Sequence, residues 1–469
     1  MTKLWQKSYI PNAQVERFEA AQNSLLDTRL IRHDVWGSLA HVTMLEHIGI
    51  LTNGELQTLK QVFNEILQLA EMGEFVIQPA DEDVHTSTEN YLAEKIGEIG
   101  KKVHMARSRN DQVLVDLRLY SKEQLHAVGK KLFTLCETLL DVAEQYMLIP
   151  MPGYTHMQRG MLSSVGLWAG AFAEALLDDE QLLSTAYALN DQCPLGSAAG
   201  YGVPLPIDRQ LVADLLGFAQ VQNNVIYVQN SRGKIEAAIL QALTQIMLDL
   251  SKLAQDTLLF TTVEYGFFQI PQEICAGSSI MPQKRNLDVM ELVRARTQTM
   301  LALQQQILGI TSGLPSGYNM DYQETKRPFM EALDLVQESL AICTLVIGNL
   351  KPNLERLVAA CTFELFATDR AYELAQAQNI AFRDAYRIVG AEVTEQLDRH
   401  IPLPVESQEQ LVARLQARNH LGAPGHPGLS LAQERLHAAR KKWQGSASTF
   451  KQAIQQLTGN VSISILEEE

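Results

Sequence analysis

Four short stretches of this chain gather side chains of the kinds that bind and transform anions. The first is ArgSerArgAsnAspGln at 107–112, which places two guanidinium groups, a hydroxyl and an amide where a helix is expected to start. A helix start offers free backbone N–H groups, and guanidinium groups add charge-assisted donors, so the pattern favours a bound anion. A helix cap with solvated charges explains the same residues about equally well.

The second stretch is MetProGlyTyrThrHisMetGln at 151–158, which puts Thr155 beside His156 on an expected tight turn between two long helices. An imidazole titrates near neutral pH and is therefore suited to moving a proton. A buried structural histidine is at least as common. Taken alone, the pair is a weak indication of acid–base chemistry.

The third stretch, AlaGlySerSerIleMetProGlnLysArgAsn at 276–286, is flexible and rich in hydroxyl groups, and it ends in two cations and an amide. Asp288 and Glu291 follow in the first turn of the next expected helix, where acidic side chains suit the helix dipole. A mobile linker between helices would explain the glycine and the serines. It would not explain a cationic cluster directly before acidic helix residues.

The fourth stretch, residues 313–326, brings Tyr318, Gln323 and Lys326 to the start of an expected helix. An ordinary helix start with a surface lysine is the alternative explanation. A further acidic run with one histidine, GluAspValHis at 82–85, is largely explained by capping of a helix that begins near Thr86 and runs to Gly97. Thr86 or Ser87 is expected to cap this helix.

Composition limits the kind of protein that carries these stretches. A length of 469 residues predicts about three domains, and 46% apolar residues provide a large core. The 28 glycines and 16 prolines together fall below their usual share of roughly 12%, which favours long regular elements. The net charge of −15 disfavours nucleic acid and anionic membranes as partners. An anionic ligand would therefore need a local cationic pocket.

Targeting and redox signals predict a reduced, cytoplasmic protein. The first residues contain no apolar segment typical of a signal peptide, and the most apolar long stretch, 164–177, is too short to span a bilayer. The five cysteines have wide, irregular spacing, and none shows zinc-ligand spacing. We therefore expect no structural metal.

Helical periodicity predicts the elements that position these stretches. Apolar residues such as Leu125, Val128 and Leu132 recur at steps of three and four, which places them on one helix face. Thr52 or Asn53 is expected to cap an early helix. Long stretches without proline lie at 112–149, 153–193, 207–270, 283–314 and 329–351. The sequence predicts an all-α protein with a small helical domain (1–110), a bundle of long helices (111–360) and a C-terminal domain of shorter helices (361–469).

In their order and wording, these stretches resemble the argininosuccinate lyase family of the fumarase/aspartase superfamily. The resemblance runs from about Leu4 to Pro424. It is carried by EDVH at 82–85, ARSRNDQV at 106–113, MPGYTHMQ at 151–158, PLGSAAG at 194–200, GSSIMPQKRN at 277–286 and GLPSGYN at 313–319. The pattern GSSIMPxKxN is shared across the superfamily. Gln283, RSRNDQ and PGYTH point to argininosuccinate lyases rather than to fumarases or adenylosuccinate lyases.

The resemblance implies an all-α homotetramer with a core of long helices and with each active site drawn from three subunits. Members of the family split N-(L-arginino)succinate into L-arginine and fumarate by anti elimination, through a carbanion held as a dianionic aci-carboxylate. No metal or organic cofactor is implied. A dianionic intermediate requires preorganised donors and cations more than it requires a nucleophile, which agrees with the cationic stretches.

Residue roles follow from the resemblance position by position. Ser278 is implied as general base, Thr155 and His156 as the acid-catalysis pair, and Glu291 as the residue that orients His156. A serine can act as a base only if loop closure excludes water and if Lys284 and backbone N–H groups stabilise its alkoxide. Substrate-holding positions are Ser108, Arg109, Asn110, Lys284, Asn286, Tyr318, Gln323 and Lys326, with His85 and Arg232 in support.

The sequence also departs from the family pattern. Met320 replaces the usual lysine after Tyr-Asn, Gly233 replaces an expected aspartate, and Leu287 replaces a proline. Residues 5–9 read TrpGlnLysSerTyr instead of TrpGlyGlyArgPhe. An early substrate-contacting serine falls at Asn23 or Ser24. These changes bear on the choice of substrate, so the alternatives are a lyase for another N-substituted aspartate and a non-catalytic tetrameric scaffold.

Overall fold

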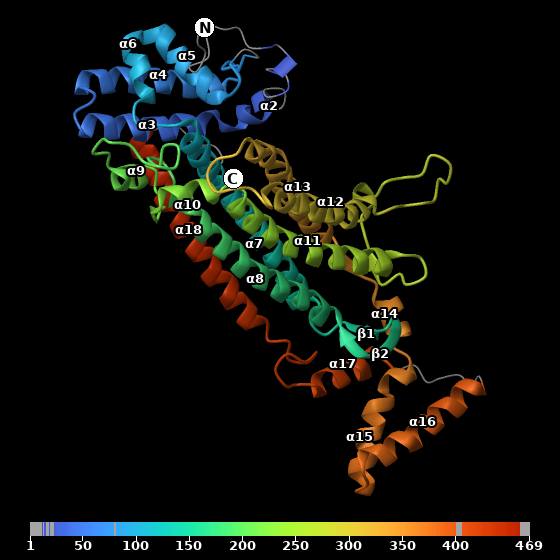
Figure 1. Cartoon of the computed structure of the whole chain (residues 1–469). Coiled ribbons are helices and arrows are strands. Elements are labelled where there is room, and N and C mark those ends of the chain that lie inside the picture. The colour runs from blue at the N-terminus through green and yellow to red at the C-terminus, as the bar shows by residue number, and fades with distance from the viewer. Residues whose placement is uncertain are drawn as a thin grey trace.

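The computed structural model describes residues 12, 14–15, 18, 23–78, 81–399 and 406–459. Long helices form an elongated bundle with shorter helices at both ends (Figure 1). The strands in the described part of the chain form three two-stranded pairs. The predicted all-α fold is confirmed. Residues 5–9, and the side chains of Asn23 and Ser24, lie outside the described residues.

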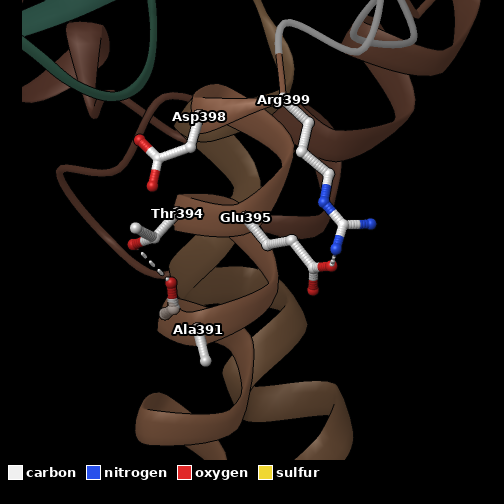
Figure 2. A pocket seen from close by; sticks show the side chains of 6 residues that line it. Ala391, Thr394, Glu395, Asp398 and Arg399 are labelled. Atoms are coloured by element: carbon white, nitrogen blue, oxygen red, sulfur yellow. Dashed lines mark hydrogen bonds and ion pairs between the residues drawn. The ribbon is translucent and has the colours of Figure 1, made fainter.

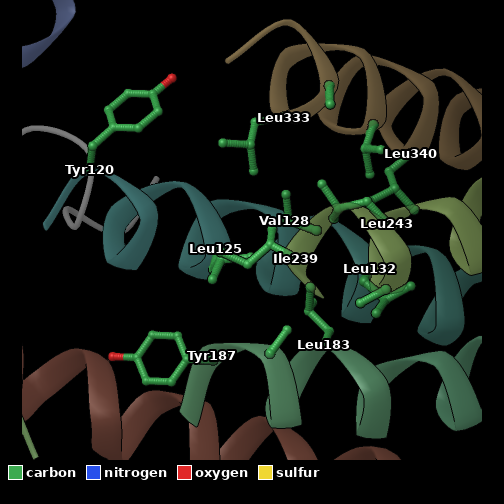
Figure 3. Packing of buried hydrophobic residues seen from close by; sticks show 14 of the residues in the cluster. Tyr120, Leu125, Val128, Leu132, Leu183, Tyr187, Ile239, Leu243, Leu333 and Leu340 are labelled. Atoms are coloured by element: carbon green, nitrogen blue, oxygen red, sulfur yellow. The ribbon is translucent and has the colours of Figure 1, made fainter. Parts of the chain in front are cut away.

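The bundle is built from α7 (Arg109–Gln145), α8 (Val165–Asn190), α11 (Lys234–Thr261), α12 (Asp288–Thr311) and α13 (Lys326–Gly348). Helix α7 packs against α8 and α13, and α11 packs against α8 and α12. Leu125, Val128 and Leu132 of α7 are completely buried, where they face Leu243 of α11 and Leu340 of α13 (Figure 3). The predicted apolar face of α7 is therefore the centre of the core.

Shorter helices cover the end of the bundle at which α7 begins. They are α2 (Asn23–Asp27), η1 (Thr28–Leu30), α3 (Ile31–His47), α4 (Asn53–Glu71), α5 (Val84–Ile96), α6 (Glu98–Lys101) and η2 (Lys102–His104). Thr52 caps α4 in a reciprocal capping box, as predicted. The prediction that Thr86 or Ser87 caps α5 is wrong. Asp83 caps it, because its carboxylate accepts bonds from both the backbone N–H and the hydroxyl of Thr86 at 2.8 Å.

A β-hairpin replaces the simple turn expected between α7 and α8. Strand β1 (Pro150–Thr155) pairs antiparallel with β2 (Gln158–Ser164), and its last pair joins Thr155 to Gln158. The other pairs are β3 (Gln192–Cys193) with β4 (Gln220–Val221), and β5 (Phe268–Gln269) with β6 (Lys351–Pro352). The hairpin extends the bundle at the end of α7 opposite to α5 (Figure 1).

Short helices also interrupt the connections between the long ones. They are α9 (Arg209–Leu215), α10 (Val225–Asn230), η3 (Gln272–Ile274) and η4 (Met320–Thr325). The proline-free stretch 207–270 therefore holds three helices rather than one. Gly217 at φ 63° and Gly233 at φ 76° lie at the breaks, where the left-handed backbone conformation favours glycine.

The C-terminal residues contain α14 (Leu354–Ala360), η5 (Phe363–Phe366), α15 (Ala367–Gln378), α16 (Phe382–Asp398), α17 (Gln408–Ala417) and α18 (Leu429–Thr458). Helices α15 and α16 project from the bundle as a pair (Figure 1). Helix α18 has 30 residues and packs along α7, α8 and α3, so the expectation of only short helices here is wrong. The division into three domains stays a prediction. None of the helices described is long and apolar enough to cross a membrane.

The start of α8, which follows the hairpin, lies very close to the end of α7, and the tightness of this packing can be tested. A Cβ atom on Gly166 would lie 2.5 Å from Met147 Cα and 2.7 Å from the Ala143 carbonyl oxygen. We predict that Gly166→Ala lowers the free energy of unfolding by about 1–3 kcal/mol, because backbone atoms must move to admit the methyl group. Urea denaturation followed by circular dichroism measures this loss.

Gly445→Ala is the matched control, because Gly445 lies inside α18 with no atom near its missing Cβ. The alanine there is expected to be neutral or to stabilise by up to about 1 kcal/mol. Equal stability of Gly166→Ala and the wild type would contradict tight packing at this junction.

Candidate functional site

The start of α7 joins two of the stretches singled out from the sequence. Ser108 caps the helix, since its Oγ accepts the backbone N–H of Asn110 at 3.3 Å. The predicted helix start is confirmed. The Arg109 guanidinium donates to Thr86 Oγ1 at 2.6 Å and to Glu82 Oε2 at 3.3 Å. The 107–112 stretch is therefore bound directly to the acidic 82–85 stretch at the start of α5.

Asp111 anchors this helix start to a third segment, the loop 194–200. One carboxylate oxygen accepts the Ser108 N–H at 2.9 Å, and the other accepts the N–H groups of Gly196 at 3.0 Å and Ala198 at 2.7 Å. Burial raises the pKa of Asp111 to about 6, although these donors favour the charged form. Sequence reasoning did not assign Asp111 a role, although its spacing from Ser108 is that of a capping box.

Arg232, Gln323 and Tyr318 form a second linked group near the same end of the bundle. The buried Arg232 guanidinium donates to Gln323 Oε1 at 3.3 Å and lies 5.8 Å from the centre of the Tyr318 ring. Gln323 then donates to the Tyr318 hydroxyl at 2.9 Å. Met320, where the family has a lysine, is half-exposed, with its sulfur 3.8 Å from the same hydroxyl. The three predicted residues thus act as one hydrogen-bonded unit.

Gly233 fits the crowded backbone beside this group. A Cβ atom on Gly233 would lie 2.1 Å from Thr311 Cγ2, and the residue has φ 76°. An aspartate in this place would require both a strained backbone and a shift of Thr311. Glycine at position 233, where the family has aspartate, therefore fits both the local packing and the left-handed backbone.

Lys326 is not the surface lysine that the alternative explanation requires. It is 2% exposed and donates to Asp27 Oδ1 at 2.6 Å. The other Asp27 oxygen accepts the backbone N–H of Val84 at 3.4 Å. The ion pair consequently ties the first residue of α13 to α2 and to the start of α5.

His85 lies in a buried cluster with two carboxylates. Its Nδ1 is 2.8 Å from Asp34 Oδ1 and 3.6 Å from Asp116 Oδ2. Burial disfavours the imidazolium, but the charge of Asp34 and its hydrogen bond outweigh burial and raise the pKa of His85 to about 9. The three side chains are spaced as metal ligands could be. At neutral pH, however, Nδ1 carries a proton and donates it to Asp34 in a hydrogen bond, so this nitrogen has no lone pair for a metal.

Thr155 and His156 lie at the exposed tip of the β1–β2 hairpin. His156 has φ 54° and Met157 has φ 64°, the left-handed pair of a two-residue hairpin turn. Asparagine and glycine are usual at such positions, so a His-Met pair carries backbone strain of order 1 kcal/mol or more per residue. The strain identifies the tip as a candidate site. The Tyr154 ring packs 6.2 Å from Phe260 and fixes the hairpin against the end of α11.

Ser278 lies in a loop closed by two backbone hydrogen bonds of 2.9 Å between Ala276 and Asn286. Its Oγ accepts the backbone N–H groups of Met281 at 3.1 Å and Ile280 at 3.4 Å. Lys284 is exposed on the same loop, and Glu291 is exposed in the first turn of α12. The loop therefore already supplies two donors to the hydroxyl oxygen that is predicted to act as a base.

The predicted residues thus divide between the two ends of the bundle (Figure 1). Helix α7 has 37 residues and is about 55 Å long at 1.5 Å per residue. Ser108 caps its first turn, whereas Thr155 and His156 lie beyond its last. The end at which α7 begins holds His85, Ser108, Arg109, Asn110, Arg232, Tyr318, Gln323 and Lys326. The opposite end holds Thr155, His156, Ser278, Lys284, Asn286 and Glu291.

A pocket of about 500 Å³ lies away from all these residues, on α16 (Figure 2). It is lined by Gly390, Ala391, Thr394, Glu395, Asp398 and Arg399. Within it, the Thr394 hydroxyl donates to the Gly390 carbonyl at 2.9 Å, and Glu395 pairs with Arg399 at 2.8 Å. Its groups satisfy one another along one helix, and it contains none of the residues predicted from the sequence.

Comparison with known proteins identifies the family of this chain. The profile of a family described as lyase matches residues 13–301. Argininosuccinate lyase of Thermotoga neapolitana is 42% identical over 396 residues, which cover 84% of this chain and 99% of that protein. The chain belongs to the argininosuccinate lyase family. The family member of Sorangium cellulosum is 42% identical over 434 residues, which cover 92% of this chain and 98% of that protein.

Solved structures show that the lyase fold extends over almost the whole chain. An EDDS lyase variant with bound fumarate superposes with a TM-score of 0.83 at 22% identity, over 96% of this chain and 95% of that one. Class II fumarase from Schistosoma mansoni superposes with a TM-score of 0.68 at 14% identity, over 84% of this chain and 92% of that one. The predicted fumarase/aspartase-like fold of this lyase is confirmed.

The Asp111 anchor gives a prediction for the start of α7. Asp111→Ala leaves three backbone N–H groups, two of them buried, without their acceptor, so we expect the free energy of unfolding to fall by about 2–3 kcal/mol. Chemical denaturation measures this change. Asp208→Ala is the control, since Asp208 caps α9 through one bond, to the N–H of Leu211; its loss is expected to cost about 1 kcal/mol. Equal losses in the two variants would argue against the anchor.

Proposed function

We propose that this chain cleaves N-(L-arginino)succinate into L-arginine and fumarate by anti elimination. Its identity with argininosuccinate lyases extends over most of the chain and supports the reaction class. The structural observation that carries the proposal is the position of Ser278 Oγ, which accepts two backbone N–H groups on a closed loop. The same donors would stabilise an alkoxide more strongly than a neutral hydroxyl, because hydrogen bonds to charged oxygen are stronger.

In this mechanism Ser278 takes the proton from the carbon next to a substrate carboxylate. The electron pair moves into that carboxylate and forms a dianionic aci-carboxylate. Lys284 and Asn286, on the same loop as Ser278, are placed to balance the added charge. Collapse of the dianion breaks the C–N bond and releases fumarate.

The departing guanidine nitrogen takes a proton as the C–N bond breaks. Thr155 and His156 are assigned to this acid step, with Glu291 orienting the imidazole. The exposed hairpin tip supports the assignment, because the left-handed backbone at His156 is strained and presents the ring away from its own core. The remaining substrate-holding residues gather at the other end of the bundle.

The separation of the two ends supports a homotetramer with shared sites. A rigid helix about 55 Å long cannot bring Ser108 and His156 of one chain to the same small substrate. Exposed leucines on four bundle helices, Leu189, Leu248, Leu301 and Leu345, offer apolar surface for contact between chains. Such contacts would place the start of α7 from one subunit beside the 276–286 loop of another. We also propose a cytoplasmic location and no cofactor.

A lyase for another N-substituted aspartate is the second candidate. Met320 and Gly233 favour it, because both positions lack the charges expected in the family beside Arg232 and Tyr318. Parallel assays with argininosuccinate and with aspartates carrying uncharged N-substituents would separate the two. Fumarate release from an uncharged adduct, with none from argininosuccinate, would replace the first proposal with this one.

The base assignment predicts the effect of removing one hydroxyl. We expect the wild type to release fumarate from argininosuccinate and Ser278→Ala to lower kcat by about 10²–10⁴-fold, with the fold unchanged. Absorbance at 240 nm follows fumarate directly. Ser279→Ala, on the neighbouring exposed residue, is the matched control and is expected to keep most of the activity. Unchanged kcat in Ser278→Ala would show that another group is the base.

Shared sites predict that two inactive variants restore each other's activity. Asn110→Ala damages the start of α7, and Ser278→Ala damages the loop at the opposite end. If one site takes these residues from different subunits, random hybrids regain up to about a quarter of wild-type activity. The measurement is turnover after the two variants are unfolded together and refolded, compared with each variant refolded alone. Absence of recovery in confirmed hybrid oligomers would place both residues of a site in one chain.

A further inference from the structure

The buried cluster of Asp34, His85 and Asp116 contains an arrangement that the proposed reaction does not yet explain. The three residues come from α3, α5 and α7, and each is at most 4% exposed. Only His85 was assigned a role from the sequence. Both oxygens of Asp116 and one of Asp34 lack hydrogen-bond partners among the described residues, which is costly for buried carboxylates. The burial of two carboxylates with so few hydrogen bonds therefore has to be explained by the charges of the three side chains.

The two ring nitrogens of His85 have different surroundings. Nδ1 is held by Asp34 at 2.8 Å. Nε2 has no hydrogen-bond partner in the described part of the chain, and it is not among the polar atoms sealed from solvent. His85 directly precedes Thr86, which accepts a bond from Arg109, so the ring belongs to the helix start that a candidate substrate-binding cation contacts. With Nδ1 fixed in this way, the imidazolium has its Nε2–H available to a ligand.

The two carboxylates do not act alike. Asp116 lies among Asp34, Asp27 and His85, and burial together with the two neighbouring acids raises its pKa well above the usual value. Asp34 is stabilised as an anion by His85 and by Arg107, which lower its pKa despite burial. Asp83, at the start of α5, is the other acid that favours the charged ring. Asp34 is consequently the direct counter-ion, whereas burial and the neighbouring acids favour the protonated form of Asp116.

We propose that Asp34 is a positioning residue that holds His85 as an imidazolium and directs its Nε2–H toward a carboxylate of the substrate. This inference rests on the proposed function and extends it, because it names the group that orients one carboxylate-binding cation. The ligand chemistry is that of a dicarboxylate, such as the succinyl part of the substrate. Asp34 is 1% exposed and is hydrogen-bonded to His85 and to Gln112, so it acts on a ligand through the histidine.

The test compares pH profiles of kcat/KM for the oligomeric wild type, Asp34→Asn and Asp116→Asn. In the wild type, the profile is expected to hold through neutral pH and to fall as His85 loses its proton near pH 9. Asp34→Asn removes the counter-ion. The fall in kcat/KM therefore moves by at least about one pH unit toward neutral pH. With a shift of one unit, kcat/KM of the variant is about twofold lower than that of the wild type at pH 8 and about fivefold lower at pH 9, and it recovers as the pH drops to 6.

Asp116→Asn is the matched control, because it changes an equally buried acid of the same cluster. Asparagine resembles the protonated acid, so the fall in kcat/KM should stay within about half a pH unit of the wild-type position. His85→Asn should abolish the pH-dependent fall in kcat/KM, both in the otherwise wild-type protein and in the Asp34→Asn variant. If Asp34→Asn lowers kcat/KM by the same factor at every pH, Asp34 has a merely structural role and the proposal is overturned. A larger shift in Asp116→Asn than in Asp34→Asn would also overturn it.

Binding of succinate, measured by calorimetry between pH 6 and 9, separates this inference from the proposed function. If the wild type fails to cleave argininosuccinate, the reaction assignment fails, but the calorimetry still reports on His85. Succinate affinity that weakens at lower pH in Asp34→Asn than in the wild type supports the inference. Succinate affinity with the same pH dependence in both proteins contradicts it, even if argininosuccinate is turned over normally.

Discussion

The length of α7 is the constraint on which the rest of the molecule depends. Its continuous backbone hydrogen bonds hold its ends about 55 Å apart, and the packing of α8, α13 and α18 along it prevents any bend that would bring them together. Each end therefore carries only part of the predicted set of reactive groups. In the reaction proposed above, each end supplies half of a site, and a second chain would complete it.

The two half-sites are held by different physical means. At the start of α7, buried acids fix the backbone and the cations: Asp111 accepts three backbone N–H groups, and Asp27 neutralises Lys326. At the opposite end, Ser278 lies on a loop and His156 lies on a strained turn, and both are exposed or partly exposed. The buried groups at the start of α7 suit binding, whereas an exposed loop at the opposite end suits closure over a substrate and exclusion of water.

Some of the acidic residues of this chain neutralise cations at the start of α7. A net charge of −15 argues against polyanionic partners, yet several cations lie at the two ends of the bundle. Buried acids such as Asp27 and Asp34 stand directly beside Lys326 and His85, so the cations can be brought close together without mutual repulsion. In the proposed reaction, these acidic residues would support a local anion site despite the negative overall charge.

Much of this could be predicted from the amino-acid sequence. The three- and four-residue spacing of leucines along α7, the helix start at 107–112 and the acidic first turn of α12 are local features, and each was predicted because the signal lies within one or two helical turns. The motifs also predicted the family. The sequence did not reveal the hairpin around His156 or the cap at Asp83, because turn and cap choices depend on small competing energies between neighbouring residues.

Only the tertiary structure decided which of the predicted residues share an end of the bundle and which acids support them. Asp34 meets His85 across 51 positions of the chain, and Asp27 meets Lys326 across 299. Such pairings leave no periodic trace in the sequence, because they arise from how rigid helices stack rather than from any local preference. The sequence determined the reactive groups and the helices that carry them. Helix packing determined their partners, their charge states and the distance that separates the two halves of the site.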